Sequence, residues 1–154
     1  MKRFFLHTLY KIYTLKNFFT RPIIIGVRVM LLRNGDEVLL VKHSYQDGWL
    51  LPGGGTKRGE TIEQAARREC REEIGAEVGE MQLVGVYTQF VHWKTDHIVL
   101  FKSEDFTITP KTDIEIECAK FFNMRELPSD MMPGSRRRIE AHLQGQPVPR
   151  SGNW

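Results

Sequence analysis

Residues 54–76, GGTKRGETIEQAARRECREEIGA, decide the fold of this chain because they join a glycine turn to a strongly specified helix. Thr61 followed three residues later by Gln64 is a capping box, in which two side chains satisfy backbone N–H groups at a helix start. Gly75 supplies the left-handed residue with which helices commonly end. These signals predict a helix over residues 61–74.

The predicted helix carries three glutamates along one edge of an apolar stripe. At 100° per residue the stripe holds Ile62, Ala66, Cys70 and Ile74, and the edge holds Glu69, Glu72 and Glu73. Like charges at such spacings cost a helix roughly 0.2–0.5 kcal/mol per pair, so a cation must compensate for them. The nearby arginines, Arg67, Arg68 and Arg71, permit a solvated, salt-bridged surface. The alternative is a metal site, because carboxylates beside the carbonyls of a glycine turn form the all-oxygen surroundings that Mg²⁺ or Mn²⁺ prefers.

The spacing of these residues resembles the Nudix box of the MutT-like hydrolases. Gly54 is followed after five residues by Glu60, and after seven more by Arg68-Glu69-Cys70-Arg71-Glu72-Glu73-Ile74-Gly75-Ala76. Every fixed position is met, while the two bulky aliphatic positions of the pattern hold the smaller Cys70 and Ala76. The resemblance covers most of residues 23–143. It implies an α/β (α+β) Nudix fold, an α/β/α sandwich around a mixed β-sheet, here with an extra N-terminal helix.

The same resemblance implies a metal-dependent hydrolase that cleaves a nucleoside diphosphate linked to another moiety. The implied metal ligands are the carbonyl of Gly53 and the carboxylates of Glu69, Glu72 and Glu73, with Mg²⁺ as the cofactor and Mn²⁺ as the alternative. Such ions neutralise pyrophosphate oxygens and orient a water. Glu60 and Arg68 are implied to hold the ligands in place, since metal ligands need outer partners to stay oriented.

The general base is open between two glutamates. Glu69 is the first candidate, and Glu115 is similar in placement to a late-loop glutamate that serves some Nudix members as an extra ligand or base. Glu104 and Glu117 are rivals for the late position. The alternative for Glu115 is an ordinary surface carboxylate.

Four residues outside the box are candidates for substrate contacts: Tyr45, Trp49, Lys42 and Arg28. The two aromatic rings are suited to stacking on a base or sugar, and equally to packing. The two cations, with His43, are candidates for phosphate contacts or else are solvated. Val91 stands where ADP-ribose hydrolases of the family have proline, and residues 92–94 lack the tyrosine of diadenosine polyphosphate hydrolases. The coenzyme A signature is also absent, which leaves a nucleoside triphosphate or a nucleotide sugar.

The remaining chain reads as strands and one further helix. Asn34-Gly35-Asp36 joins two aliphatic runs, 23–33 and 37–43, and predicts a hairpin. Further strands are predicted at 82–93, 98–102 and 116–123, with a turn around Lys94-Thr95-Asp96, and a last helix at about 133–143. This order indicates a mixed α/β or α+β domain.

Composition excludes several other classes of protein. The 154 residues fit one domain, and a net charge of +3 is too small for a protein that coats nucleic acid. No run reaches the roughly 20 apolar residues of a membrane span. Cys70 and Cys118 lack metal-ligand spacing and are predicted to be buried free thiols. His7 and Lys11 interrupt any secretion signal, so a cytoplasmic protein is expected.

Residues 4–19 form an amphipathic helix candidate with aromatic and basic side chains. A membrane-surface helix is one interpretation, but its cations are few and not confined to one side. We therefore expect it to cover apolar surface on the domain or on the second subunit of a homodimer. The expected organisation is an N-terminal helical segment (1–21), a Nudix domain (22–145) and a C-terminal tail (146–154).

Two functions from different classes follow from the resemblance. The first is an active Mg²⁺-dependent hydrolase acting on a small nucleoside diphosphate derivative, and the second is a catalytically silent Nudix-fold module that senses a nucleotide. A silent module is expected to lose box carboxylates, whereas this chain keeps Glu60, Glu69, Glu72 and Glu73. The sequence therefore favours the enzyme.

Overall fold

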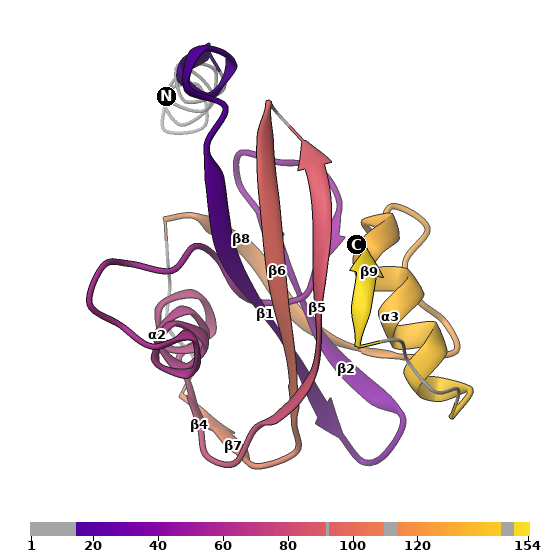
Figure 1. Cartoon of the computed structure of the whole chain (residues 1–154). Helices are drawn as coiled ribbons and strands as arrows, with labels where there is room; N and C mark the ends of the chain where they lie inside the picture. Colours follow the sequence, from indigo (N-terminus) through magenta and orange to yellow (C-terminus); the bar gives the residue numbers. More distant parts are fainter. Residues whose placement is uncertain (1–14, 92, 110–113, 146–149) are drawn as a thin grey trace.

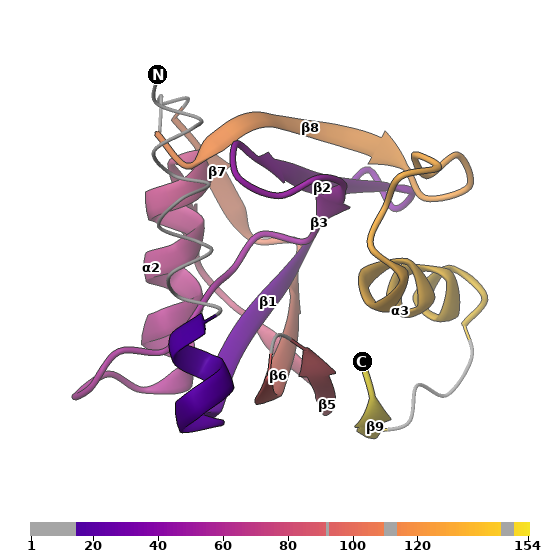
Figure 2. The same ribbon diagram turned by 90° about the horizontal axis from the view of Figure 1, so that it is seen from above.

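The computed structural model describes residues 15–91, 93–109, 114–145 and 150–154. A mixed seven-stranded sheet lies between two helices, with α2 (Ile62–Ile74) on one face and α3 (Pro133–Leu143) on the other (Figures 1 and 2). This arrangement confirms the predicted α/β/α sandwich around a mixed sheet.

The strands of the main sheet follow the order β3-β2-β1-β6-β5-β9, and β8 pairs with the other side of β2. Their bounds are β1 Ile23–Arg33, β2 Glu37–His43, β3 Trp49–Leu50, β5 Gln82–Val91, β6 Lys94–Ser103, β8 Ile116–Asn123 and β9 Ser151–Asn153. A separate two-stranded sheet joins β4 (Ala76–Val78) to β7 (Phe106–Ile108).

The predicted β1–β2 hairpin is confirmed with its turn. Asn34 and Gly35 both have positive φ (56° and 79°), as a tight hairpin turn requires. The two strands pair only next to the turn, at Leu32↔Val38 and Arg33↔Glu37, and then separate. The rest of β1 instead pairs in parallel with β6, from Ile23↔Thr95 to Leu31↔Ser103. The sheet thus opens into two arms, visible in Figure 2, with β2, β3 and β8 in one and β6 and β5 in the other.

Two hydrophobic cores fill the two faces of the sheet. Alternate residues of β1 and β2 point to opposite faces, so Val29 and Val41 pack under α2 while Met30 and Leu40 pack under α3. Tyr87 is the largest fully buried side chain of the α3 side. Each helix therefore covers its own core, and α2 packs on the face of β1 that carries Val29.

The turn between β5 and β6 differs from the prediction. Lys94-Thr95-Asp96 belongs to β6, and the chain reverses one residue earlier, at Trp93, whose φ is 65°. The predicted stripe of α2 also differs at its start, because Ile62 is exposed (37%) and Ala65 is buried in its place. Ile62 is the first residue of the helix, so its side chain precedes the part of the helix that packs on the sheet.

The predicted C-terminal tail ends in a strand. Within it, β9 pairs in parallel with β5, from Val86↔Ser151 to Thr88↔Asn153. The ring of Trp154 lies 5.9 Å from that of Tyr87. It also occupies the space over Gly134, where a Cβ atom would overlap it. The chain end is therefore packed between the sheet edge and α3.

The predicted N-terminal helix is described only from residue 15, and residues 15–20 are helical. The ring of Phe18 lies 5.0 Å from that of Trp93 at the β5–β6 turn, while Phe19 is 77% exposed. The rest of the predicted segment lies outside the described residues. Within the described residues, no helix is both long and apolar enough to cross a membrane.

Removal of residues 1–20 is expected to lower the melting temperature by several degrees or to dissociate a homodimer. The physical reason is that the Phe18–Trp93 contact is lost, and that an exposed aromatic surface such as Phe19 usually marks an interface. Thermal melts and light scattering measure these effects. An unchanged core together with lost binding to anionic vesicles would show instead that the segment contacts membranes.

Both cysteines are free, as predicted, but only Cys70 is buried. Cys118 is exposed because β8 lies at the edge of the sheet and pairs on one side only, with β2. Burial, with the nearby charges of Glu73 and Glu69, raises the pKa of the Cys70 thiol.

We expect a thiol reagent to modify Cys118 alone in the native protein and both cysteines after denaturation. Modification of neither in denatured, unreduced protein would show that they are bonded.

Candidate active site

The local structure of α2 is the one its capping residues predict. The Thr61 hydroxyl accepts the Gln64 N–H at 3.2 Å, and the Gln64 side chain accepts the Thr61 N–H at 2.8 Å. Gly75 ends the helix in the left-handed conformation, with φ 66°. Both ends of the helix are therefore stabilised by capping residues that do not belong to its charged edge.

The glycine turn before α2 lies directly on β1. Val27 and Val29 donate backbone hydrogen bonds to the carbonyls of Gly54 (2.8 Å) and Pro52 (2.9 Å). Gly53 has φ 138°, and a Cβ atom there would overlap the Val27 carbonyl oxygen. A Cβ on Gly54 would come within 2.7 Å of the Glu69 carboxylate. Glycine at these positions therefore lets the turn lie between β1 and the carboxylates of α2.

Arg68 is the centre of the charged edge of α2. Its guanidinium forms a two-bond pair with Glu60 (3.0 and 2.7 Å) and also contacts Glu69 at 2.6 Å and Glu72 at 2.9 Å. It donates a further hydrogen bond to the Gly55 carbonyl at 2.9 Å. One arginine thus joins three carboxylates to the glycine turn.

These contacts set the pKa values of the outer carboxylates. The hydrogen bonds from Arg68, assisted by the backbone N–H of Lys57, lower the pKa of Glu60 to about 2. Burial of Glu72 raises its pKa, but the hydrogen bonds and charges of Arg68 and Lys57 together lower it by a larger amount. The net shift of the Glu72 pKa is therefore downward. Both groups are therefore ionised at neutral pH.

Glu73 has the opposite environment, because it is buried (8% exposed) on the sheet side of α2. Burial raises its pKa to about 8, although the charge of Arg28 and the hydrogen bond from the Gly53 N–H (2.9 Å) oppose that shift. The charges of Glu69 and Glu115 raise it further. On its other oxygen, Glu73 lies 3.4 Å from His43 Nε2. A buried carboxylate in such surroundings is stable as an anion only when a cation or further donors compensate for it.

The other predicted residues divide into two groups, of which the first lies at the glycine turn and the end of β2. Arg28 donates to the carbonyls of Leu51 (3.1 Å) and Gly53, so it lies at the glycine turn. Tyr45 lies near the site, with its ring 5.0 Å from that of His43. The loop carrying Glu115 joins the end of β2, because Ser44 donates its N–H to the Glu115 carbonyl at 2.8 Å.

The second group lies on the α3 side of the sheet, away from the charged edge of α2. Trp49 packs on Phe122, with ring centres 4.7 Å apart, as part of the core under α3. Lys42 lies opposite Trp49 in register and 3.7 Å from Asp130. The packing interpretation therefore describes the observed position of Trp49.

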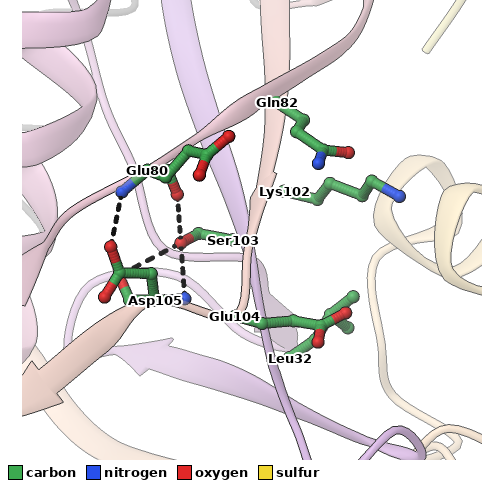
Figure 3. Close-up of a pocket in the computed structure, with 7 residues that line it drawn as sticks. All are labelled: Leu32, Glu80, Gln82, Lys102, Ser103, Glu104 and Asp105. Carbon is green, nitrogen blue, oxygen red and sulfur yellow. Dashed lines mark hydrogen bonds between the residues drawn. The ribbon is translucent and has the colours of Figure 1, made fainter.

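The two rivals of Glu115 have different surroundings. Glu117 is exposed on β8. Glu104 lines a cavity of about 230 Å³ with Leu32, Glu80, Gln82, Lys102, Ser103 and Asp105 (Figure 3). There Ser103 donates to the Glu80 carbonyl (2.6 Å) and Asp105 accepts the Glu80 N–H (2.8 Å), so these groups hold a turn together.

His43 is a residue of this site for which the sequence carries only a weak signal. The pairing of β2 with β8 shifts register between Lys42 and His43, and Glu117 is the residue left without a partner in the ladder. The extra residue is on β8, so β2 keeps its alternation and His43 lies on the α2 side with Leu39 and Val41. The alternation gives the face of His43, but its contact with Glu73 depends on the packing of α2 on the sheet and has no local signal in the sequence.

The donor set fits a hard divalent cation. Glu69, Glu72 and Glu73 with the Gly53 carbonyl supply oxygen atoms only, and the buried Glu73 carboxylate calls for a compensating positive charge. Over the described ranges, however, no three carboxylate, histidine or cysteine side chains converge closely enough to form a ligand set as they stand. In this conformation these oxygens are instead contacted by cationic side chains, those of Arg28, Lys57 and Arg68.

The chain is similar to proteins of known sequence and known structure. The family model of the NUDIX domain matches residues 22–143. The chain is 31% identical over 120 residues to a putative 8-oxo-dGTP diphosphatase of Bacillus subtilis, covering 78% of this chain and 80% of that one. It is 29% identical over 125 residues to the uncharacterized Nudix hydrolase YvcI of the same species, with 75% and 77% covered. A solved NUDIX hydrolase from Nitrosomonas europaea superimposes with a TM-score of 0.71 at 25% identity, over 82% of this chain and 92% of that chain.

Proposed function

Because the chain belongs to the Nudix family of pyrophosphohydrolases, we propose that it hydrolyses the pyrophosphate linkage of a nucleoside triphosphate with Mg²⁺ as its cofactor. Two arrangements of charged side chains around α2 support this proposal. Arg68 gathers Glu60, Glu69 and Glu72, and Glu73 is buried against the glycine turn. All four carboxylates that a silent module is expected to lose are present.

The residues that would hold the metal are Glu69, Glu72, Glu73 and the carbonyl of Gly53. When bound, Mg²⁺ supplies charge neutralisation of the pyrophosphate oxygens and lowers the pKa of water. Glu60 and Arg68 keep the carboxylates of α2 in place, because Arg68 is itself fixed by the two-bond pair with Glu60. Mn²⁺ has the same ligand preferences and is expected to substitute.

The chain's own residues perform the proton transfer and hold the substrate. Glu69 is the proposed general base, which accepts the proton of the attacking water on a carboxylate oxygen, and Glu115 is the alternative on the facing loop. Arg28, at the glycine turn, is proposed to contact phosphate oxygens. Tyr45 is proposed to contact the sugar or base from beside His43.

Nucleoside triphosphates are the first candidate substrates for two reasons. The sequence lacks the family signals for ADP-ribose, diadenosine polyphosphates and coenzyme A. The relative of which the chain covers 80% is named as a putative 8-oxo-dGTP diphosphatase. A cytoplasmic location fits this proposal, because the proposed substrates are free nucleotides and both cysteines of the chain are free thiols.

The test is a panel of nucleoside triphosphates, an oxidised deoxyguanosine triphosphate and nucleotide sugars, each assayed with Mg²⁺, with Mn²⁺ and with chelator. Chromatography of the products shows which bond breaks. We expect nucleoside monophosphate and pyrophosphate from a triphosphate, only when metal is present. Turnover of the nucleotide sugars alone would reject the triphosphate proposal, and no turnover of any compound would reject hydrolysis.

A further inference from the structure

One end of the molecule exposes large apolar side chains that lie outside the proposed active site. It is formed by the helical residues 15–20, the start of β1 and the β5–β6 turn, which lie together at the end opposite to β4 and β7 (Figure 1). We call this surface the apolar end, and its exposed members are Leu15, Phe18, Phe19, Ile23, Phe90 and Trp93. Exposed apolar patches of this kind mark contact with a partner or a membrane.

Contacts between the three segments make the apolar end one surface. The Phe18 ring lies 5.0 Å from the Trp93 ring, and the guanidinium carbon of Arg21 lies 5.7 Å from the centre of the same ring. Thr95 donates its N–H to the Pro22 carbonyl at 3.0 Å. The helical residues are therefore attached to the β5–β6 turn.

The sheet continues the same surface beyond the reach of α2. In register, Ile23 of β1 lies beside Thr95 of β6, and Thr95 lies beside Phe90 of β5. Alternation along the strands places this row on the face that carries Val27. Val27 is buried in the core under α2, whereas Ile23 (73%) and Phe90 (80%) are exposed. The end of the β1–β6–β5 arm therefore presents an apolar face that α2 does not cover.

The chain that forms the apolar end is basic. Residues 1–35 and 81–95 contain no aspartate or glutamate, and the first stretch holds Lys2, Arg3, Lys11, Lys16, Arg21, Arg28 and Arg33. Lys16 and Arg21 are exposed beside the aromatic rings. The next carboxylate on β6, that of Asp96, is buried and lies 3.6 Å from Lys94 Nζ. An anionic partner therefore suits this end of the molecule.

A groove of about 530 Å³ opens at the β5–β6 turn. It is lined by Arg21, Phe90, Val91, Trp93, Lys94 and Thr95. Two cations and two aromatic rings thus border one space. This combination suits a lipid head group, because its phosphate contacts cations while aromatic rings occupy the boundary between head groups and acyl chains.

We propose that the apolar end binds the surface of a membrane that contains anionic lipids. Leu15, Phe19 and Phe90 enter the boundary between head groups and acyl chains, and Lys16 and Arg21 contact lipid phosphates. The sequence of residues 4–19 does not favour this contact by itself, because its cations are few and not confined to one side. The structure adds the β5–β6 turn, so the binding surface is an end of the molecule and not one face of a helix.

Charge and shape favour a membrane over the other possible occupants. Two copies of the chain meeting through this end would bring the same cations together without opposing carboxylates, which disfavours a homodimer here. Single-stranded nucleic acid would stack on the rings but would gain nothing from the exposed aliphatic Leu15 and Ile23. A lipid surface accommodates both the cations and the aliphatic side chains.

Flotation of the full chain with vesicles tests the proposal. We expect binding to vesicles of phosphatidylcholine mixed with phosphatidylglycerol, and about 10–100-fold weaker binding to phosphatidylcholine alone. Phe90→Ala should weaken binding to the mixed vesicles about tenfold, and Arg21→Gln about fivefold, whereas Arg21→Lys should retain it. The matched control is Leu83→Ala, because Leu83 is also exposed (62%) but lies at the other end of β5. This variant should bind like the wild type.

Tryptophan fluorescence locates the contact. Trp93 is exposed, whereas Trp49 and Trp154 pack against the core under α3. Mixed vesicles with brominated acyl chains should therefore quench the emission of Trp93. Trp93→Phe keeps an aromatic ring, so it should still float with the vesicles while the quenching disappears. Deletion of residues 1–20 should lower the melting temperature, because the Phe18–Trp93 contact is lost, and should also weaken flotation.

Wild-type protein that does not float with the mixed vesicles would overturn the proposal, as would equal flotation of the wild type, Phe90→Ala and Arg21→Gln. Light scattering and titration of a labelled single-stranded RNA, both without vesicles, identify the other occupants. A dimer or an RNA complex that these two variants weaken, in a protein that does not float, would reject the membrane. Turnover of soluble nucleotides should be unchanged in both variants, so the proposed function is tested separately. Thermal melts confirm that the variants are folded.

Discussion

Glu73→Gln is expected to lower kcat about a thousandfold or more, because a lost metal ligand removes several kcal/mol of transition-state stabilisation. The same change should raise the melting temperature of the metal-free protein. Glu73 is buried and has a pKa of about 8, against an ordinary 4.5, so the folded chain holds a proton that the unfolded chain releases. Glutamine has the same shape without the charge.

The sign of this effect with pH follows from the direction of the shift. A raised pKa in the folded state contributes stability below about pH 4.5 and loses it as the pH rises through about 8. The stability advantage of Glu73→Gln should therefore grow between about pH 5 and pH 9. Added Mg²⁺ should reverse the order, because only the wild type gains stability by binding it.

The exposed Glu63→Gln on the same helix is the control for these measurements, and it should retain both turnover and the wild-type melting profile. Turnover of Glu73→Gln close to that of the wild type would remove Glu73 from the proposed ligand set. A melting temperature that fell equally at every pH would show that burial does not penalise its charge.

Arg68→Ala is expected to lower kcat about 10–100-fold and to lower the melting temperature by several degrees. The guanidinium contacts Glu60, Glu69 and Glu72 and is itself mostly buried, so its removal leaves three carboxylates facing one another. Loss of the residues that orient metal ligands typically has this effect on activity. Arg68→Lys keeps the charge without the two-bond fork, so it should recover stability more than activity.

Arg71→Ala is the matched control. Arg71 lies one helical turn after Arg68, and it forms an exposed ion pair with Glu77 on β4. Exposed pairs contribute little, so this variant should melt and turn over like the wild type. If Arg68→Ala and Arg71→Ala behaved alike, Arg68 would be an ordinary surface arginine and the orienting role proposed for it would be wrong.

Features set by a few adjacent residues are predictable from the sequence. Thr61 and Gln64 begin α2, Gly75 ends it, and Asn34-Gly35 turns β1 into β2, because each of these signals acts within one turn of chain. The spacing from Gly54 to Ala76 likewise indicates the family by itself. Local chemistry is therefore sufficient for these elements, and the fold follows from the resemblance that the box carries.

Features that depend on distant contacts are not predictable in this way. Trp93 adopts a positive φ that its residue type does not favour, so the sequence predicts the β5–β6 turn too late. The strand β9 has three residues and exists because β5 offers an edge and Trp154 covers Gly134. The contact of His43 with the buried Glu73 joins β2 to α2, and no local signal in the sequence marks it.

The most direct test of a metal-dependent site at α2 is the turnover of a nucleoside triphosphate by chelator-stripped protein as Mg²⁺ is added back, with Glu73→Gln alongside. We expect no turnover without metal, full recovery of the wild type, and less than about one thousandth of that rate for Glu73→Gln at saturating Mg²⁺. Hydrolysis that continued in excess chelator, or a fully restored Glu73→Gln, would contradict the assignment of the site to this helix.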